Sequence, residues 1–163
     1  MSLLQVKGLG KVYNTKLGMR QCIALKNVNF EVEKGEICGM IGADGAGKTS
    51  IFRMLTTLLL PDSGSAKVLG YDVVKDYQEI RKEVGYMPGR FSLYQDLSVE
   101  ENLNFYATLF GTTVEENIDL IRDIYVQIEP FKKRRAGKLS GGMKQKLALC
   151  CALIHKPRVL FLD

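Results

Sequence analysis

The sequence lacks cysteine pairs, long apolar runs and any second histidine. None of its four cysteines lies in a CxxC pair, which argues against a zinc site or a disulfide framework. We expect Cys22, Cys38, Cys150 and Cys151 to be buried thiols in a reducing cytosol. No apolar run approaches the ~18 residues that cross a bilayer, and no signal-peptide pattern opens the chain. The sequence therefore predicts a soluble chain, for which any membrane role requires a partner.

A strong charge imbalance is also missing. The composition, 46% hydrophobic and 25% charged, is that of an ordinary globular domain, which excludes a disordered chain. The net charge of +5 permits nucleic acid, anionic lipid or nucleotide as a partner. The densest basic cluster is Lys132 to Arg135, which we interpret as a solvated or partner-facing edge. We expect no nucleic-acid partner.

Strand-like and helix-like segments alternate along the chain. Val28 to Val32 alternates apolar and polar residues, as a half-buried strand does, and Ile37 to Ile41 has the composition of a fully buried strand. A helix is predicted from Ser50 to Leu60, because Pro61 follows, and strands at Ser65 to Leu69 and Val84 to Met87. This alternation favours a parallel α/β sheet.

The second half of the chain has helical periodicity. Apolar residues recur at helical spacing from about Val99 to Tyr125, with Gly111 as a C-cap. Ser140 can cap a helix that runs to about His155. At that C-terminus the histidine is expected to relieve the helix dipole rather than perform chemistry. Val159 to Leu162 reads as a buried strand.

The strongest motif is a full match to GxxxxGK[ST], placed between an apolar run and a helical stretch. It consists of Gly42, Ala43, Asp44, Gly45, Ala46, Gly47, Lys48 and Thr49. Glycines let backbone N–H groups wrap around phosphates, and the N-terminus of the following helix adds positive potential. We expect Lys48 to act as the catalytic cation on the β- and γ-phosphates, and Thr49 to bind Mg²⁺. The motif predicts an ATP site that extends to Ser50.

Two further segments suggest phosphate chemistry. Asp163 follows four apolar residues, and a carboxylate at the end of a buried strand can hold Mg²⁺ through its hydration shell. A simple turn residue is the alternative. Leu139 to Met143 reads LSGGM, which is either an N-capped helix start or a second anion site.

Taken in order, the three motifs resemble those of the ABC ATPase family. The signature motif of that family usually reads LSGGQ, and Met143 is a variant frequent in subunits that serve exporters. The resemblance runs from Leu4 to Asp163 and marks the chain as the N-terminal portion of a nucleotide-binding domain. It implies an α/β P-loop NTPase with an antiparallel β subdomain, a parallel-sheet core and an inserted helical subdomain.

The resemblance also implies an arrangement of domains and partners. Residues 1–88 and 139–163 would form the nucleotide-binding core, whose C-terminal part would lie beyond Asp163. Residues 89–138 would form the helical subdomain that touches an integral membrane transporter subunit. The protein would be cytoplasmic and peripheral on the inner face of the cell membrane.

Further site residues follow from the same resemblance. Tyr13 lies where the family carries an aromatic residue that stacks on adenine. Ser140, Gly141 and Gly142 would contact the γ-phosphate held by another subunit. A homodimer, or a pair of ATPase subunits, would thus sandwich two ATP molecules with Mg²⁺.

The sequence departs from the family at two places. Gly89 occupies the position of a glutamine that senses the γ-phosphate and Mg²⁺. The family's catalytic glutamate comes directly after the position of Asp163, and a histidine lies on a later strand. A chain that ends at Asp163 is therefore expected to be marginally stable and to hydrolyse ATP slowly or not at all.

Three functions stay open. The first is the energy-coupling ATPase subunit of an ABC transporter, with export favoured by the LSGGM variant. The second is a non-transport ABC ATPase that acts on ribosomes or DNA. The third is a module that binds nucleotide without further activity.

Overall fold

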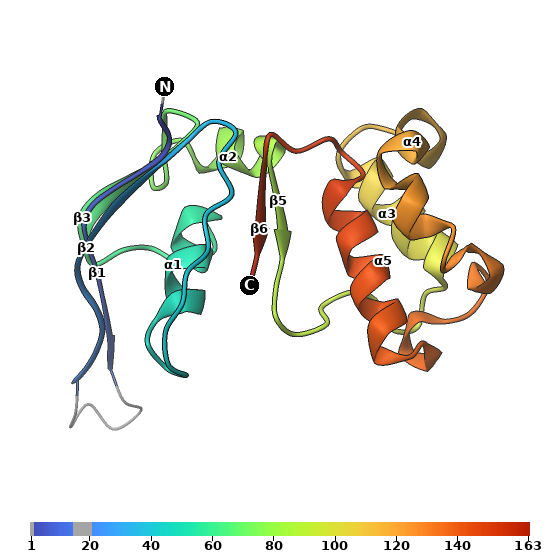
Figure 1. Ribbon diagram of the computed structural model, residues 1–163, viewed down its shortest axis with the longest axis horizontal. Coiled ribbons are helices and arrows are strands. Elements are labelled where there is room, and N and C mark those ends of the chain that lie inside the picture. The colour runs from blue at the N-terminus through green and yellow to red at the C-terminus, as the bar shows by residue number, and fades with distance from the viewer. Residues whose placement is uncertain (1, 15–20) are drawn as a thin grey trace. The chain divides into compact units, whose positions relative to one another are not determined.

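The computed structural model describes residues 2–14 and 21–163, which form two compact units. The first unit spans Met1–Arg81 and the second spans Lys82–Asp163 (Figure 1). No helix in the described part of the chain is both long enough and apolar enough to cross a membrane.

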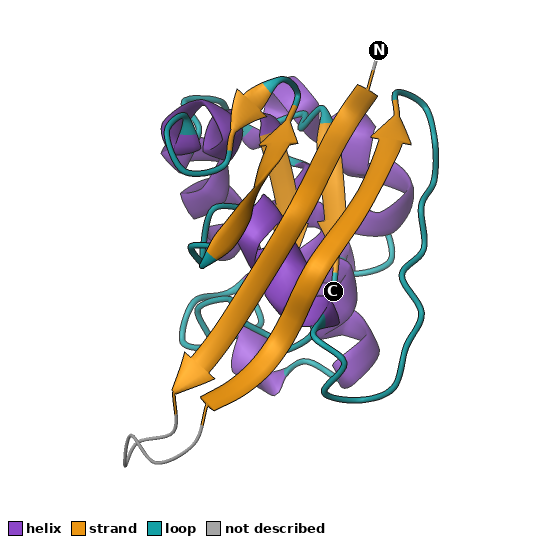
Figure 2. Cartoon of the chain, turned by 90° about the vertical axis from the view of Figure 1, so that its left-hand side faces the viewer, coloured by secondary structure: helices purple, strands orange, loops and turns teal. Residues whose placement is uncertain are grey.

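The first unit is built on an antiparallel sheet with the strand order β2-β1-β3-β4. Its strands are β1 (Ser2–Asn14), β2 (Gln21–Glu33), β3 (Ser63–Val68) and β4 (Tyr71–Asp72). Figure 2 shows the long strands β1 and β2 running side by side. Helix α1 (Lys48–Leu55) contacts β3 and buries Ile51, Met54 and Leu55. The antiparallel β subdomain that the family resemblance implies is confirmed.

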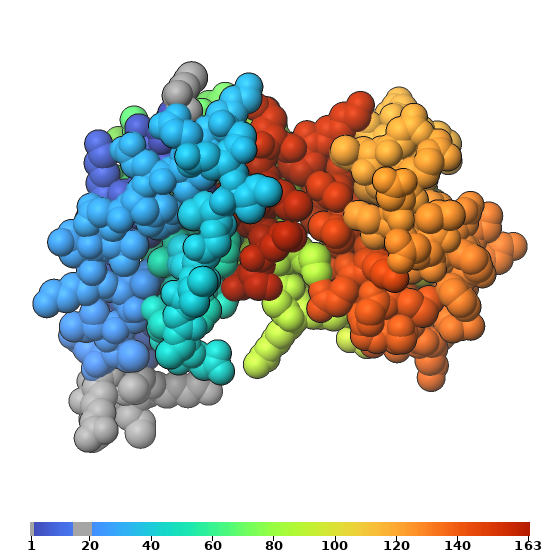
Figure 3. Space-filling view, in the orientation of Figure 1, coloured from blue at the N-terminus to red at the C-terminus, as the bar shows by residue number. Residues whose placement is uncertain are grey.

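The predicted buried strand at Ile37–Ile41 is wrong. These residues form no strand, and the side chains of Ile37 and Ile41 are fully exposed. In Figure 3 the segment that precedes α1, coloured cyan to turquoise, lies at the surface of the first unit. A buried strand needs partners for its N–H and C=O groups, and no described strand pairs with this segment. Composition indicated the preference of these residues, but pairing decides their structure.

Helix α1 is shorter at its C-terminal end than the predicted helix Ser50–Leu60. Thr57 has a positive φ of 63°, which turns the chain out of the helix. The N–H groups of Leu58 and Leu59 both donate to the carbonyl oxygen of Arg53 and close the end of the helix. A local turn, and not Pro61, therefore ends α1.

The second unit contains a parallel strand pair and three α-helices. Strands β5 (Val84–Met87) and β6 (Val159–Leu162) pair in parallel, as predicted, and follow helix α2 (Tyr77–Glu83) and helix α5, respectively. The remaining elements are α3 (Val99–Leu109), α4 (Val114–Tyr125), η1 (Glu129–Phe131), η2 (Ala136–Lys138) and α5 (Gly141–Leu153).

The helix boundaries of this unit follow from capping chemistry. Ser98 with Glu101, and Thr113 with Glu116, form capping boxes at the starts of α3 and α4. The C-cap of α3 is Phe110, so the predicted C-cap at Gly111 is one residue too late; Gly111 follows with a φ of 70°, and the predicted helical stretch divides there into α3 and α4.

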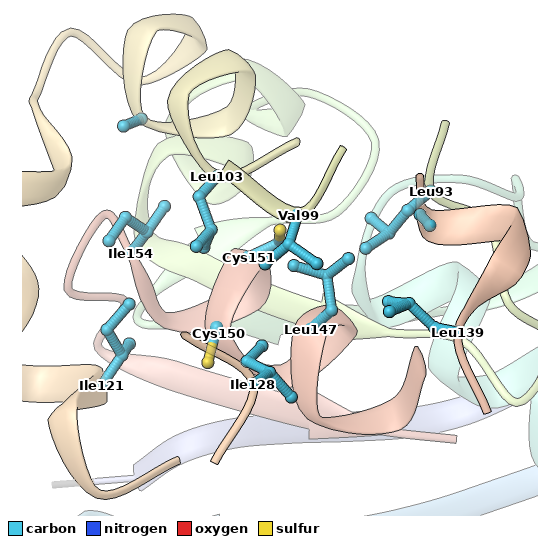
Figure 4. Close-up of a cluster of buried hydrophobic side chains, with 12 residues drawn as sticks. Leu93, Val99, Leu103, Ile121, Ile128, Leu139, Leu147, Cys150, Cys151 and Ile154 are labelled. Atoms are coloured by element: carbon cyan, nitrogen blue, oxygen red, sulfur yellow. The ribbon is translucent and has the colours of Figure 1, made fainter. Parts of the chain in front are cut away.

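The core of the second unit is centred on α5. Figure 4 shows Leu147, Cys150 and Cys151 of α5 among Leu103 of α3 and Ile121 of α4. The buried residues of α5 are Leu147, Cys150, Cys151 and Ala152. The division into residues 1–88 with 139–163 and 89–138 stays a prediction, since the two compact units do not test it.

Burial of the cysteines was predicted correctly for only two of them. Cys150 and Cys151 are buried, and desolvation raises the pKa of Cys150 to about 12. Cys22, on β2, and Cys38, in the unpaired segment before α1, are exposed. Cys22 lies on an edge strand of the sheet and Cys38 in a segment that pairs with no described strand, and the composition alone reveals neither position.

Candidate functional site

The phosphate-loop motif forms a tight turn that leads into α1. Gly45 and Gly47 adopt positive φ angles of 79° and 93°. A Cβ atom on Gly47 would lie 2.6 Å from Cδ2 of Leu25 and 2.8 Å from the carbonyl oxygen of Ala24. Within the turn, the N–H of Ala46 donates to the carbonyl of Ala43 at 3.1 Å. Only glycine fits at position 47, so the end of the loop is fixed by sterics.

The Lys48 ammonium is held against this loop. Its Nζ donates to the carbonyl oxygens of Gly42 and Ala43 at 2.7 and 2.8 Å. Gly47 caps α1 without a side-chain hydrogen bond, and the first turn of α1 carries no acidic residue. A cation and the N-terminal amides of a helix thus face the same loop, where no carboxylate of that turn competes for them. This donor set fits a phosphate group.

The structure brings Tyr13 and Ser50 together. The Tyr13 hydroxyl and the Ser50 Oγ lie 2.9 Å apart, which joins β1 to the first turn of α1. Tyr13 remains 37% exposed. Thr49 and Asp44 are also exposed at this end of α1 and on the loop. An aromatic ring therefore lies beside the predicted phosphate site.

The signature residues lie at the start of α5. The Ser140 Oγ accepts a hydrogen bond from the Met143 N–H at 3.4 Å, as an N-cap does. A Cβ atom on Gly141 or Gly142 would meet no described atom within 4 Å. Packing within the unit therefore does not require glycine at these two positions. The capped-helix alternative from the sequence is confirmed, and the open glycines leave room for an anion beside it.

Asp163 sits at the end of β6 and is bound to β5 by its backbone and its side chain. Its N–H donates to the Met87 carbonyl at 3.0 Å, and its Oδ2 accepts from the Tyr86 hydroxyl at 3.1 Å. Sequence reasoning missed Tyr86. The contact depends on the parallel register, which pairs Tyr86 with Phe161 and Met87 with Leu162 and which no sequence motif encodes.

Gly89 lies close to the backbone of Asp163. A Cβ atom at position 89 would lie 3.2 Å from the Asp163 carbonyl oxygen, tighter than an ordinary contact. A larger residue at position 89 would therefore require its neighbours to shift. The departure from the family's glutamine is matched by a close backbone approach in this chain.

His155 is half-buried, and its ring contacts residues outside α5. Its ring stacks on Phe110 with centroids 3.8 Å apart, and its Nε2 lies 3.1 Å from the Val84 carbonyl oxygen. Burial lowers the pKa of His155 below its usual value. These contacts join α5 to α3 and β5, and the expected dipole role stays a prediction.

The predicted site residues therefore form two groups. Tyr13, Ser50 and the loop Gly42 to Thr49 belong to the first unit. Ser140 to Gly142 and Asp163 belong to the second unit.

Comparison with known proteins places these motifs in a family context. The family model described as ABC transporter matches residues 25–163. The chain is 47% identical over 142 residues to a probable multidrug ABC transporter ATP-binding protein, YbhF, of Escherichia coli. The matched region covers 86% of this chain and 25% of that protein. It is 35% identical over 160 residues to the doxorubicin resistance ATP-binding protein DrrA of Mycobacterium tuberculosis, with 97% of this chain and 47% of that protein covered.

A solved structure extends the likeness to the fold. The dimeric bacterial ABC transporter cassette MJ0796 superposes with a TM-score of 0.84 at 25% identity, over 98% of this chain and 73% of that one. The chain spans a quarter to a half of the length of the two curated relatives. The α/β fold with an antiparallel sheet, a parallel sheet and a helical region agrees with this likeness.

Proposed function

Because this chain belongs to the ABC transporter family, we propose that it binds MgATP as part of the energy-coupling ATPase subunit of a transporter. The observation that carries the proposal is the Lys48 ammonium, held within 2.8 Å of two loop carbonyls at an uncapped helix N-terminus. Lys48 would release these carbonyls for the β- and γ-phosphates, which offer it full negative charges.

Oxygen donors suited to Mg²⁺ are present in both units. Thr49 offers a hydroxyl at the start of α1, and Asp163 offers a carboxylate at the end of β6. Hard oxygen ligands are those that Mg²⁺ prefers, and bound Mg²⁺ neutralises charge on the phosphates. The Tyr86 hydroxyl would orient the Asp163 carboxylate for this task.

The role of the signature residues would require a second subunit. We propose that Ser140, Gly141 and Gly142 contact the γ-phosphate bound by another ATPase subunit, in a homodimer or a pair of related subunits. The open space around Gly141 and Gly142 supports this role, since nothing within the unit uses it. The dimeric cassette that this fold resembles supports the stoichiometry.

The names of the relatives guide the proposal on transport. YbhF is described as a probable multidrug transporter component and DrrA as a doxorubicin resistance protein. We propose that the full-length protein works with an integral membrane subunit in export, on the cytoplasmic face of the membrane. Hydrolysis is proposed for the full-length protein, because the resemblance places the water-activating glutamate directly after Asp163.

The experiment that tests this function is purification of the full-length protein from mildly solubilised membranes, followed by an ATPase assay. The expected result is co-purification with an integral membrane subunit and hydrolysis that Lys48→Ala abolishes. Lys34→Ala, in an exposed turn, is the matched control and should retain the activity. Isolation without any membrane subunit, or activity unaffected by Lys48→Ala, would contradict the proposal.

A further inference from the structure

The side chain of Lys11, on β1, is only 12% exposed. Lysine is rarely buried to this degree unless its charge is paired. The Lys11 Nζ donates to the carbonyl oxygen of Leu60 at 2.8 Å and to Oδ1 of Asp62 at 3.1 Å. The side chain is therefore fixed by the loop that follows α1.

Asp62 also forms two hydrogen bonds with the backbone of β1 next to Lys11. Its Oδ2 accepts from the Val12 N–H at 2.7 Å, and its own N–H donates to the Gly10 carbonyl at 3.0 Å. The hydrogen bond from the Val12 N–H, followed by the one from the Lys11 ammonium, lowers the pKa of the Asp62 carboxyl below its usual value. Asp62 therefore contacts three consecutive residues of β1, Gly10, Lys11 and Val12, just before Tyr13.

The Lys11 ammonium is also directed at the predicted adenine-binding residue. Lys11 and Tyr13 are two residues apart on β1, where the pairing with β2 is irregular between Lys11 and Val12. The Lys11 Nζ lies 5.8 Å from the centroid of the Tyr13 ring, within the range of a cation–π contact. The hydroxyl of the same ring is held by Ser50 at 2.9 Å. The ring is thus restrained at its edge by α1 and on its face by Lys11.

We propose that Lys11, fixed by Asp62, is a positioning residue that orients the Tyr13 ring for stacking on the base of a bound purine nucleotide. The proposal rests on the proposed function, because it takes the phosphates to be bound at Lys48. A ring whose orientation is fixed before binding loses less conformational freedom when a base stacks on it. Lys11 would therefore strengthen binding of the base without contacting the phosphates.

The test separates the base from the phosphates. MgATP and magnesium tripolyphosphate, which has no base, are titrated calorimetrically into the full-length protein and its variants. Lys11→Met is expected to weaken MgATP binding by about threefold to tenfold and to leave tripolyphosphate binding unchanged. Lys7→Met, an exposed lysine on the same strand, is the matched control and should bind both ligands as the wild type does.

Two further variants exclude a general structural effect. Lys11→Arg keeps a cation that can lie over the Tyr13 ring, and its MgATP affinity should stay within about twofold of that of the wild type. In a Tyr13→Ala background, Lys11→Met should have no additional effect, since the ring on which it acts is absent. Equal loss of both ligands in Lys11→Met, or unchanged MgATP affinity, would overturn the positioning role alone. Absence of MgATP binding in the wild type would overturn the proposed function and this inference together.

Discussion

The Tyr86 hydroxyl donates a hydrogen bond to Oδ2 of Asp163 at 3.1 Å, and so links the side chains of two adjacent parallel strands. A ligand carboxylate that is oriented by a neighbour binds a metal more tightly than one free to rotate. The carboxylate predicted from sequence as a magnesium residue therefore has a partner that the sequence motif does not contain.

Substitution of Tyr86 by phenylalanine tests this partnership. The ring is retained while the donor is lost, so the apparent Mg²⁺ affinity in the presence of ATP should fall by up to about tenfold. Binding of ATP without Mg²⁺ should not change. The measurement is a Mg²⁺ titration of ATP binding in the full-length protein, with Tyr71→Phe as the control. Equal Mg²⁺ affinity in wild type and Tyr86→Phe would show that the hydroxyl does not orient Asp163.

Two glycines with similar φ angles separate strain from steric clash. Gly47 and Gly35 have φ angles of 93° and 88°, but only Gly47 has atoms within 4 Å of a Cβ position. Gly35→Ala should lower the free energy of unfolding by about 1 kcal/mol through backbone strain. Gly47→Ala should cost about 3 kcal/mol and abolish ATP binding, because strain and clash combine. Urea unfolding measures the free-energy cost of each substitution, and equal costs for the two variants would contradict the geometry of the loop.

The side chain of Asn102 is buried in the second unit and makes several hydrogen bonds to the backbone. It is 0% exposed, accepts from the Tyr94 N–H at 3.1 Å and donates to the Tyr94 and Ser98 carbonyls at 3.0 and 2.9 Å. Asn102→Ala leaves these groups without their partner and should cost about 2–4 kcal/mol. Asn104→Ala, two residues further on the exposed side of α3, should cost less than about 0.5 kcal/mol. Similar unfolding midpoints for the two variants would contradict this assignment.

The capping box of α4 predicts a dependence of stability on pH. The Thr112 hydroxyl and the Thr113 N–H both donate to the Glu116 carboxylate and lower its pKa below the usual value. A lowered pKa in the folded state means that the stabilisation is present above the unfolded pKa of about 4.3. It is lost as the pH falls through the folded pKa.

Glu116→Gln isolates this contribution, because glutamine keeps an acceptor and does not titrate. Stability is measured by urea unfolding between about pH 5 and pH 3, a range that includes the reference pKa of glutamate. The loss of stability over this range should be smaller in Glu116→Gln than in the wild type. Glu115→Gln on the same turn is the control. A pH profile of Glu116→Gln identical to that of the wild type would rule out the cap as its source.

Local sequence signals predicted the elements that depend on local chemistry. Ser140 caps α5 and β5 occupies Val84–Met87, as predicted, and Gly111 lies one residue past the C-cap of α3. Each rests on capping, a positive φ or a short apolar run. The segment Ile37–Ile41 failed because a strand requires hydrogen-bonding partners from distant parts of the chain, and composition does not supply them.

The same distinction applies to the site. The phosphate loop was predictable because its residues are contiguous and glycine-dependent, as Gly47 shows. The contacts of Tyr13 with Ser50 and of Tyr86 with Asp163 join residues 37 and 77 positions apart. Such contacts depend on strand register and helix placement, which no motif encodes.

Binding of nucleotide phosphates by the loop from Gly42 to Thr49 is measured by calorimetric titration of MgATP into the full-length protein. We expect saturable binding to the wild type, no binding to Lys48→Ala, and unchanged binding to Lys34→Ala. Wild-type binding that persists in Lys48→Ala, or no binding to the full-length wild type, would contradict this role of the loop.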